Sequence, residues 1–287
     1  MKKYIKRFLA KIGNALSDSL VKQNNVYIQS MVNNDIQKIY DNKKYAEPGR
    51  LLRSGFKVWS QNDEDGIIQE IFNRIDTKNK YFVEIGVGDG LENNTLFLLV
   101  KGWKGLWVEG SRKNFNFIEK KFNTLINQGI LKKDNAFINI DNINQVLMRN
   151  SVPEEIDLLS IDIDGNDYHI FKALKATSPR LVVIEYNAKF PPPVLWVMSY
   201  NPGHIWDASD YFGASLKSFE RLFAARGYSL VGCSLTGANA FFVRNDLVAD
   251  KFCPPFTAEN HYEPPRYWLT QGFVAGRMAN FGDFESL

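Results

Sequence analysis

The chain has 287 residues, of which 45% are hydrophobic, 14% aromatic and 23% charged. This composition is typical of a folded globular protein with one large domain and a small appendage, and it excludes a disordered or fibrous chain. The net charge of +3 is too small for a surface that follows nucleic-acid phosphates, so we expect no nucleic-acid partner.

Residues 1–22 place apolar side chains at helical spacing with lysines between them, which predicts a basic amphipathic helix. One interpretation is peripheral attachment to an anionic membrane surface. The other is a helix that docks on the body of the protein or pairs in a homo-oligomer. The apolar positions are Ile5, Phe8, Leu9, Ile12, Leu16 and Leu20.

The same stretch lacks the unbroken apolar run of a signal peptide, and no segment approaches the roughly 20 apolar residues of a membrane span. Cys233 and Cys253 are the only cysteines, and no CxxC motif or Cys/His cluster surrounds them. This predicts reduced thiols, not a disulfide framework or a zinc site. We therefore expect a cytoplasmic protein, either free or at the inner face of the membrane.

Residues 23–60 are polar and rich in asparagine, which predicts a helical lead-in followed by a loop. Asp63, Glu64 and Asp65 then precede an apolar run, and carboxylates in the first turn of a helix oppose its macrodipole. We interpret them as capping groups, with the alternative that one borders a ligand cleft. We place the main domain at residues 58–250, after a helical extension at residues 1–57.

Strand-like and helix-like segments alternate from residue 81 onward, which predicts a parallel sheet with helices on both faces. After a helix at residues 215–226, two strands flank a short loop with Gly237 and predict an antiparallel hairpin. The expected strands are residues 81–85, 105–108, 135–140, 156–163, 180–186, 228–233 and 239–243. The expected helices between them are residues 92–101, 112–127, 143–149 and 168–175.

The predicted fold class is therefore α/β, a Rossmann-like sandwich with a mostly parallel seven-stranded sheet and a C-terminal antiparallel hairpin. It resembles the sheet of class I methyltransferases. The tail at residues 251–287 is rich in proline and aromatic residues without clear periodicity. We expect it to pack across the body or a partner subunit.

The stretch from Val83 to Gly90 predicts a nucleotide-binding turn, since a buried strand runs into three glycines at alternate positions. Leu91 occupies the place of the third glycine of a dinucleotide fingerprint, so a pyrophosphate is not expected there. Glu84 then suits a cationic partner such as the amino group of a methionine moiety. Glu109 ends the next strand, where a carboxylate can accept hydrogen bonds from both ribose hydroxyls of an adenosine.

Four segments carry a resemblance to the FkbM-like branch of S-adenosyl-L-methionine (SAM)-dependent O-methyltransferases, a family associated with bacterial sugars and glycans. They read VEIGVGDG, LWVEGS, DLLSIDIDGNDYHIFKAL and GYSLVGCSLTGANAFFVRNDL, within residues 58–247. The resemblance implies a SAM pocket with the adenine against residues 139–143. The cofactor-binding residues that we predict are Glu84, Gly86, Gly88, Asp89, Glu109, Asn139 and Asp162.

Carboxylates gather where the fourth and fifth predicted strands end. Asp162 and Asp164 share a strand face, and Glu185 and Asn187 follow the neighbouring strand. Oxygen ligands from adjacent strand ends suit Mg²⁺, which would lower the pKa of an acceptor hydroxyl. We predict Asp164, Glu185 and Asn187 as metal ligands, and the sequence here resembles metal-dependent O-methyltransferases. The alternatives are substrate hydrogen bonding and helix capping.

Residues 188–214 form an insertion that we expect to cover the substrate as a lid. His204 within it is a candidate base for the proton that leaves the acceptor, so the predicted catalytic residues are Asp164, His204 and Asp162. Aromatic side chains for a sugar face are Tyr168, Tyr200, Trp206 and Tyr211, with lid packing as the alternative role.

The leading hypothesis is a SAM-dependent O-methyltransferase acting on a hydroxyl of a sugar, nucleotide-sugar or glycan, in the biosynthesis of surface polysaccharide such as a capsule. One alternative keeps the enzyme class with a nitrogen or carboxyl acceptor. Another is an NAD-binding oxidoreductase. A scaffold that retains the fold without turnover is the third.

Overall fold

The computed structural model describes residue 24, residues 26–273 and residues 278–284. The helix predicted at residues 1–22 lies outside the described residues. In the described part, seven strands form one sheet in the order β3-β2-β1-β4-β5-β7-β6. The strands are β1 (Tyr81–Ile85), β2 (Lys104–Val108), β3 (Leu131–Asp134), β4 (Glu155–Ile161), β5 (Ser178–Glu185), β6 (Tyr228–Cys233) and β7 (Asn239–Arg244).

The first five strands are parallel, and β7 runs antiparallel to both β5 and β6. This arrangement confirms the predicted α/β class, including the antiparallel hairpin at the end. The helices are α2 (Glu64–Ile75), α3 (Leu96–Val100), α4 (Arg112–Lys121), α5 (Asn123–Asn127), α6 (Ile143–Arg149), α7 (Asp167–Ala173), α8 (Leu216–Ala224), α9 (Asn245–Val248) and α10 (Ala258–His261), with short 3-10 turns η1 (Lys43–Ala46), η2 (Leu52–Ser54) and η3 (Tyr267–Phe273).

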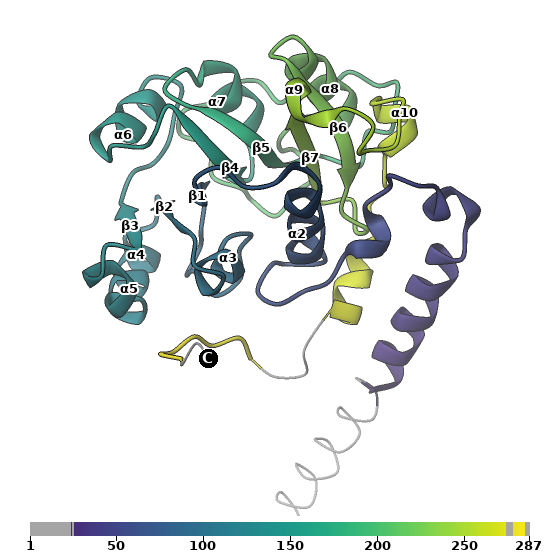
Figure 1. Ribbon diagram of the computed structural model, residues 1–287, viewed down its shortest axis with the longest axis horizontal. Coiled ribbons are helices and arrows are strands. Elements are labelled where there is room, and N and C mark those ends of the chain that lie inside the picture. Colours follow the sequence, from purple (N-terminus) through teal and green to yellow (C-terminus); the bar gives the residue numbers. More distant parts are fainter. Residues whose placement is uncertain (1–23, 25, 274–277, 285–287) are drawn as a thin grey trace, which may run out of the picture.

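The sheet is covered on both faces, since its central strands are buried in nearly every position. Alternate side chains of one strand enter different layers, so Val83 packs with α6, α7 and α8 while Phe82 packs with α2, α3 and α4. Figure 1 shows these two groups of helices on opposite sides of the sheet. The carboxyl ends of the parallel strands consequently meet at one edge.

Three predicted elements were wrong in their bounds. The helix predicted at residues 92–101 begins only at Leu96. The third strand is residues 131–134, not 135–140. The alternating apolar side chains of the predicted strand belong to a loop instead, where Ile138 is buried in the core beside Ala136 and Ile140. The helix predicted at residues 112–127 is divided at Phe122, whose buried ring packs against Trp107.

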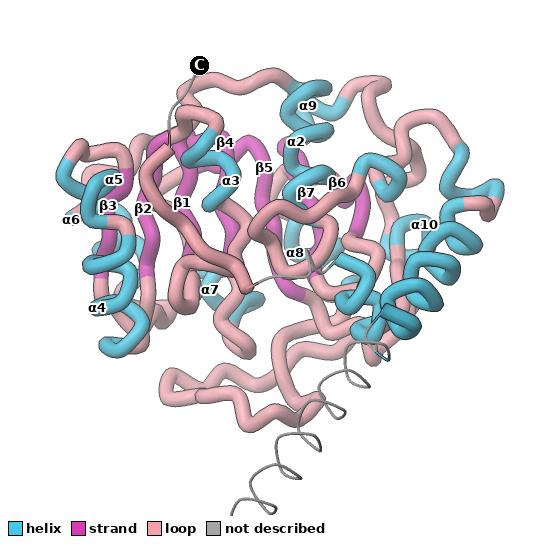
Figure 2. Tube along the Cα trace, turned by 90° about the horizontal axis from the view of Figure 1, so that it is seen from below, coloured by secondary structure: helices cyan, strands magenta, loops and turns pink. Residues whose placement is uncertain are grey.

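The tail packs across the body, as one of the two alternatives expected. Leu269 is buried against Val32 and Ile36 of the helix at residues 26–40. Tyr45 donates a hydrogen bond to Glu263 over 2.8 Å, and the hydroxyl of Tyr186 donates to the carbonyl of the same glutamate over 2.6 Å. Figure 2 shows this helix along the outside of the molecule. None of the helices described is both long and apolar enough to cross a bilayer.

Candidate active site

The turn after β1 holds two glycines with different surroundings. Gly86 has a φ of +85°, and a Cβ on it would lie 1.6 Å from the carbonyl oxygen of Asp162. The ends of β1 and β4 therefore touch at a point where only glycine fits. Gly88 has a φ of +63°, but a Cβ on it would find no heavy atom of the described residues within 4 Å. One side of this turn is open.

Glu109 joins that open turn to β2. Its carboxylate accepts hydrogen bonds from the backbone N–H groups of Gly88 at 2.8 Å and Ser111 at 2.6 Å. Burial raises the pKa of Glu109, and the N–H donors act against the rise. Each oxygen keeps a further lone pair, so the carboxylate can accept from a ligand beside Gly88.

Glu84 is buried and accepts hydrogen bonds from the segment that follows the turn. It accepts from the backbone N–H of Asn94 at 2.9 Å and from the Thr95 hydroxyl at 2.5 Å, and the indole of Trp107 donates to that hydroxyl over 2.7 Å. Burial raises the pKa of Glu84 to about 7, although its hydrogen bonds oppose the shift. Its contact with a ligand amino group stays a prediction.

The helix after the turn begins late. Residues 91–95 are bends, and α3 starts only at Leu96. The exposed side chain of Asp89 accepts from the N–H of Leu91 at 2.9 Å, which stabilises the turn. No helix N-terminus stands directly behind Gly88, where a dinucleotide-binding fold would hold its pyrophosphate.

Asn139 lies in the loop that follows β3, the place expected for adenine. Its side-chain oxygen accepts from the N–H groups of Asp141 at 2.9 Å and Asn142 at 3.0 Å. These bonds fix the loop before α6 begins at Ile143. Asn139 therefore shapes the loop through its own backbone, and its contact with adenine stays a prediction.

Three carboxylates converge where β4 and β5 end. Asp162, Asp164 and Glu185 each offer an oxygen within 4.8 Å of the other two. Burial raises the pKa values of Asp162 and Glu185, and the neighbouring carboxylates raise them further. Glu185 Oε2 is buried without a hydrogen-bond partner among the described residues. Ionised carboxylates only accept hydrogen bonds. A cluster of them therefore fits a bound cation, or a ligand with several hydrogen-bond donors.

The buried residue Asp167 fixes the loop that carries Asp164. The Asp167 carboxylate accepts from the N–H groups of Ile163 and Gly165, both at 2.9 Å. These bonds hold a tight loop in which Asp164 has a φ of +54°. The sequence did not single out Asp167, because an acid opening a helix is explained equally well by capping.

The amide of Asn187 finds its hydrogen-bond partners in the lid. Its nitrogen donates to the carbonyls of Asp210 at 2.9 Å and Phe212 at 3.0 Å, and its oxygen accepts from the N–H of Lys189 at 3.1 Å. Asn187 therefore anchors the lid. Its role as a metal ligand stays a prediction.

The lid is fastened to the loop that carries Asp164. Asn166 donates to the carbonyl of Asn201 over 2.6 Å, and Gly213 donates to the carbonyl of Gly165 over 3.1 Å. His204 Nε2 lies 3.2 Å from the Asp164 carbonyl. A carbonyl only accepts, so this nitrogen carries the proton and Nδ1 of the neutral ring is the acceptor. The structure therefore brings His204 to the carboxylates.

The predicted aromatic residues divide into two groups. Tyr168 and Tyr200 flank His169 at ring distances of 5.6 and 5.5 Å, so they contribute to packing under the lid. Trp206 and Tyr211 are exposed on the lid. Of the four residues, this second pair is the more exposed.

The tail brings a further aromatic residue to the site. Tyr262 donates to the carbonyl of Ala188 over 2.6 Å, which holds the tail at the first residues of the lid. Tyr267 follows, and its pKa is raised to about 12 by burial and by the charge of Glu185. The aromatic composition of the tail was the only sequence signal, because Tyr267 is 82 residues from Glu185 and in no motif.

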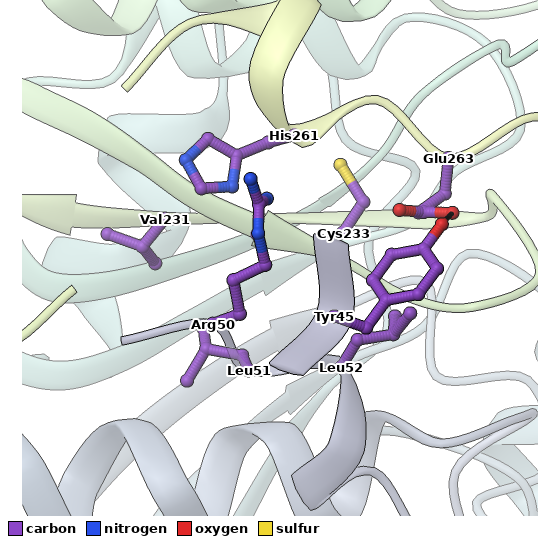
Figure 3. Close-up of a pocket in the computed structure, with 9 residues that line it drawn as sticks. Tyr45, Arg50, Leu51, Leu52, Val231, Cys233, His261 and Glu263 are labelled. Carbon is purple, nitrogen blue, oxygen red and sulfur yellow. Dashed lines mark hydrogen bonds between the residues drawn. The ribbon is translucent and has the colours of Figure 1, made fainter. Parts of the chain in front are cut away.

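A separate cavity lies at the outer strand β6 (Figure 3). Its volume of about 20 Å³ is close to that of a single water. Burial lowers the pKa of His261 in its wall to about 4, so that ring is neutral. Cys233 beside it is a free thiol. We assign this cavity a structural role. Its lining includes Tyr45, Arg50, Cys233, His261 and Glu263.

No protein family model matches the chain, and no curated protein matches it. Solved structures that resemble it include the O-methyltransferase from Bacillus cereus in complex with SAH, at 16% identity over 75% of this chain and 89% of that chain, with a TM-score of 0.42. The methyltransferase domain of bacterial CtHen1-C has 14% identity over 64% and 97%, with a TM-score of 0.41. A SAM-dependent methyltransferase from Clostridium acetobutylicum has 13% identity over 74% and 98%, with a TM-score of 0.39. At such identities the likeness concerns the fold alone.

Proposed function

We propose that the protein is a SAM-dependent methyltransferase that methylates a hydroxyl of a sugar, nucleotide-sugar or glycan. The observation that carries the proposal is the pair formed by Gly88 and Glu109. A carboxylate with spare acceptor capacity stands beside a turn that leaves room for a ligand. Two vicinal ribose hydroxyls are the donors that such a carboxylate binds.

The residues present fit SAM. Glu109 would hold the ribose, and Gly86 and Gly88 would let the ligand approach the strand ends. Asp162 belongs to the carboxylate cluster, and its backbone carbonyl lies against Gly86, so this carboxyl group is close to the glycine turn. A cationic sulfonium beside it would favour its charged form. SAM supplies an electrophilic methyl group when bound. The remaining task of the chain is to place an acceptor oxygen and to remove its proton.

A dinucleotide-dependent oxidoreductase fits the same edge less well. Its pyrophosphate requires a helix N-terminus directly behind the glycine turn. Here five residues of bends separate that turn from α3. The late start of the helix favours a ligand without a pyrophosphate.

The acceptor site favours a hydroxyl-rich molecule. Asp164 and Glu185 provide acceptors for hydroxyl donors, and Trp206 and Tyr211 on the lid offer ring faces for the apolar face of a sugar. We assign His204 Nδ1 as the base that takes the proton from the hydroxyl being methylated. Nitrogen and carboxyl acceptors are outcomes of the test below.

The carboxylate cluster also fits a divalent cation. Asp162, Asp164 and Glu185 are hard oxygen donors, and the orphaned Oε2 of Glu185 needs a partner. Mg²⁺ bound there would lower the pKa of an acceptor hydroxyl. Asp164 and Glu185 would then orient the acceptor through the ion.

Calorimetric titration with SAM and with its demethylated product tests the cofactor. We expect one equivalent of each to bind, and Glu109→Gln to weaken binding about tenfold to a hundredfold, because a charged acceptor for two hydroxyls is lost. The matched control is Glu154→Gln, since Glu154 is exposed and its side chain has no hydrogen bond in the described structure. If neither ligand bound the wild-type protein, the proposal would be wrong.

The acceptor is tested by mass spectrometry. The protein is incubated with SAM and separate sets of nucleotide-sugars, oligosaccharides, amines and carboxylic acids. A product heavier by one CH₂ unit, as results when a methyl group replaces a hydroxyl proton, in either of the first two sets supports a hydroxyl acceptor. Methylation confined to the amines or acids would overturn the sugar assignment but keep the enzyme class. Binding of SAM without any turnover in all four sets would favour a scaffold.

A further inference from the structure

Glu185 shares its face of the sheet with a buried asparagine, Asn239. Val183 on β5 and Phe241 on β7 both pack in the layer that contains α2. Side chains two apart on a strand point to the same face, so Glu185 and Asn239 also lie on the face toward α2. The two residues stand directly opposite each other in the pairing of β5 with β7, where Cβ atoms are about 4.5–5.5 Å apart. Their side chains are therefore neighbours at the carboxyl edge.

Glu64, at the beginning of α2, fixes the orientation of the Asn239 amide. Nδ2 of Asn239 donates to the Glu64 carboxylate over 3.0 Å, and the opposite orientation would place two acceptors against each other. Asn239 is only 3% exposed, and its Oδ1 has no hydrogen-bond partner among the described residues. A buried carbonyl without a donor or a cation is unfavourable, so this oxygen indicates a bound partner.

The charge around these two neighbours indicates what that partner is. Oε2 of Glu185 also lacks a hydrogen-bond partner in the described part of the chain. Asp162 and Asp164 each bring a carboxylate oxygen within 4.8 Å of one from Glu185. The charges that act most strongly on Asp162 and Glu185 come from other acids. Carboxylates this close repel one another unless a cation lies between them.

The class of cation follows from the atoms that would bind it. Carboxylates and an amide carbonyl are hard oxygen donors, which Mg²⁺, Mn²⁺ and Ca²⁺ prefer. We propose that Asn239 Oδ1 is a further ligand of a divalent cation bound by the carboxylate cluster. The inference rests on the cation site of the proposed function, and it adds a ligand from β7 to that site.

This assignment gives one of the acids before α2 a function besides capping. Glu64 is fully buried, and its charge acts on Asp162 of the cluster. Its carboxylate also accepts from the backbone N–H of Asn62 at 2.8 Å, which holds it in place. Glu64 is therefore a positioning residue that leaves the oxygen of the Asn239 amide free for the cation. Partners of this kind orient the ligands of many metal sites.

Binding of Mn²⁺ to the full chain tests the inference, with the free ion measured by electron paramagnetic resonance. We expect the wild type to bind one equivalent. Asn239→Leu should bind the ion about tenfold to a hundredfold more weakly, and Asn239→Asp should stay within about threefold of the wild type. An aspartate keeps an oxygen at this position and adds a charge that attracts the cation. For a merely structural amide, aspartate would be the more damaging change, because it repels Glu64.

Asn144→Leu is the matched control. Asn144 lies on α6, where its amide donates to the carbonyl of Ala173 at 3.0 Å and accepts from the N–H of Lys175 at 2.7 Å. This variant should melt at a lower temperature and bind Mn²⁺ like the wild type.

Unchanged Mn²⁺ affinity of Asn239→Leu would overturn the inference, as would a wild type that binds no Mn²⁺. Loss of binding in Asn239→Asp would overturn it too, so the test stays decisive if Asn239→Leu does not fold. Calorimetric titration of the same samples with SAM reports on the proposed function separately. A wild type that binds SAM without Mn²⁺ would remove the cation site and keep the methyltransferase.

Discussion

Glu84 is a carboxyl group whose exposed fraction is only 2%. Its pKa is raised to about 7, chiefly because burial removes water from the charged form. The pKa of an unperturbed glutamate is 4.5, so the Glu84 carboxyl group binds its proton more tightly in the folded state than in the unfolded state. The resulting stability is fully present below pH 4.5 and is lost as the pH rises through 7.

We therefore expect the free energies of unfolding of the wild type and of Glu84→Gln to diverge with pH. Relative to the variant, the wild type should lose about 3 kcal/mol between pH 4.5 and pH 8, since one pKa unit corresponds to about 1.4 kcal/mol. Urea unfolding at several pH values measures this difference, and the other buried acids cancel in it. Parallel pH profiles of the two proteins would show that the burial of Glu84 does not shift its pKa.

His204 is the residue for which kinetics give the clearest readout. His204→Ala should lower kcat about 10²-fold to 10⁴-fold, as expected when a general base is removed. The Kd of the variant for SAM should stay unchanged. The assay measures demethylated cofactor formed with the acceptor found by the screen. A variant that keeps its kcat and raises only KM would assign His204 to lid positioning.

At the scale of elements, the two glycines of the first turn have different requirements. Gly86 is fixed by the close approach of β4, whereas Gly88 faces open space. Gly88→Ala should cost about 1–2 kcal/mol of stability through its positive φ and should also block cofactor binding by filling that space. Gly102→Ala is the matched control, because Gly102 has a φ of +78° and equally open surroundings away from the site.

Thermal unfolding and calorimetry separate the two effects. Both variants should melt at similarly lowered temperatures, and only Gly88→Ala should bind SAM weakly. Equal binding by the two variants would show that the space beside Gly88 is not the cofactor site.

The elements also show what the sequence could predict. Strands β1, β4 and β5 each contain neighbouring apolar residues that are buried, so they were found within two residues of their ends. β3 was missed because its residues Leu-Lys-Lys-Asp bury only Leu131. The neighbouring loop alternates apolar residues more regularly, since Ile138 fills the core from a non-strand backbone. An alternating pattern of apolar residues indicates that side chains are buried, but loops can bury side chains as well as strands.

The site residues also divide into those that local sequence indicates and those that depend on contacts between distant segments. Glu109, Asp162 and Glu185 were selected because strand ends mark the ligand edge of an α/β sheet, and their roles stay predictions. The lid role of Asn187 was missed because it depends on the carbonyls of residues 210 and 212. Tyr267 was missed because only the path of the tail brings it to Glu185. Contacts between distant segments leave no periodic signal.

At the scale of the molecule, the carboxyl edge gathers buried acids from several strands. Asp162 and Glu185 share raised pKa values because burial and mutual repulsion both disfavour their charged forms. Mg²⁺ should therefore stabilise the protein by about 2.7 kcal/mol at a hundredfold excess over its Kd. The effect should be larger at pH 8 than at pH 5, because the carboxylates must be ionised to bind the ion.

Melting temperatures with magnesium chloride, against sodium chloride of equal ionic strength, measure this stabilisation. Glu185→Gln should abolish it, and Glu154→Gln should retain it. Identical melting curves in the two salts would leave the carboxylates as hydrogen-bond acceptors for substrate alone.

The helix at residues 26–40 and the tail bury each other, although almost the entire chain separates them. Val32 and Ile36 are covered by Leu269, and Tyr45 reaches Glu263. On the ribosome, the early helix is therefore complete long before its covering residue has been synthesised. Its inner face stays open to chaperones throughout that interval, and assembly of this region is a late event of biogenesis.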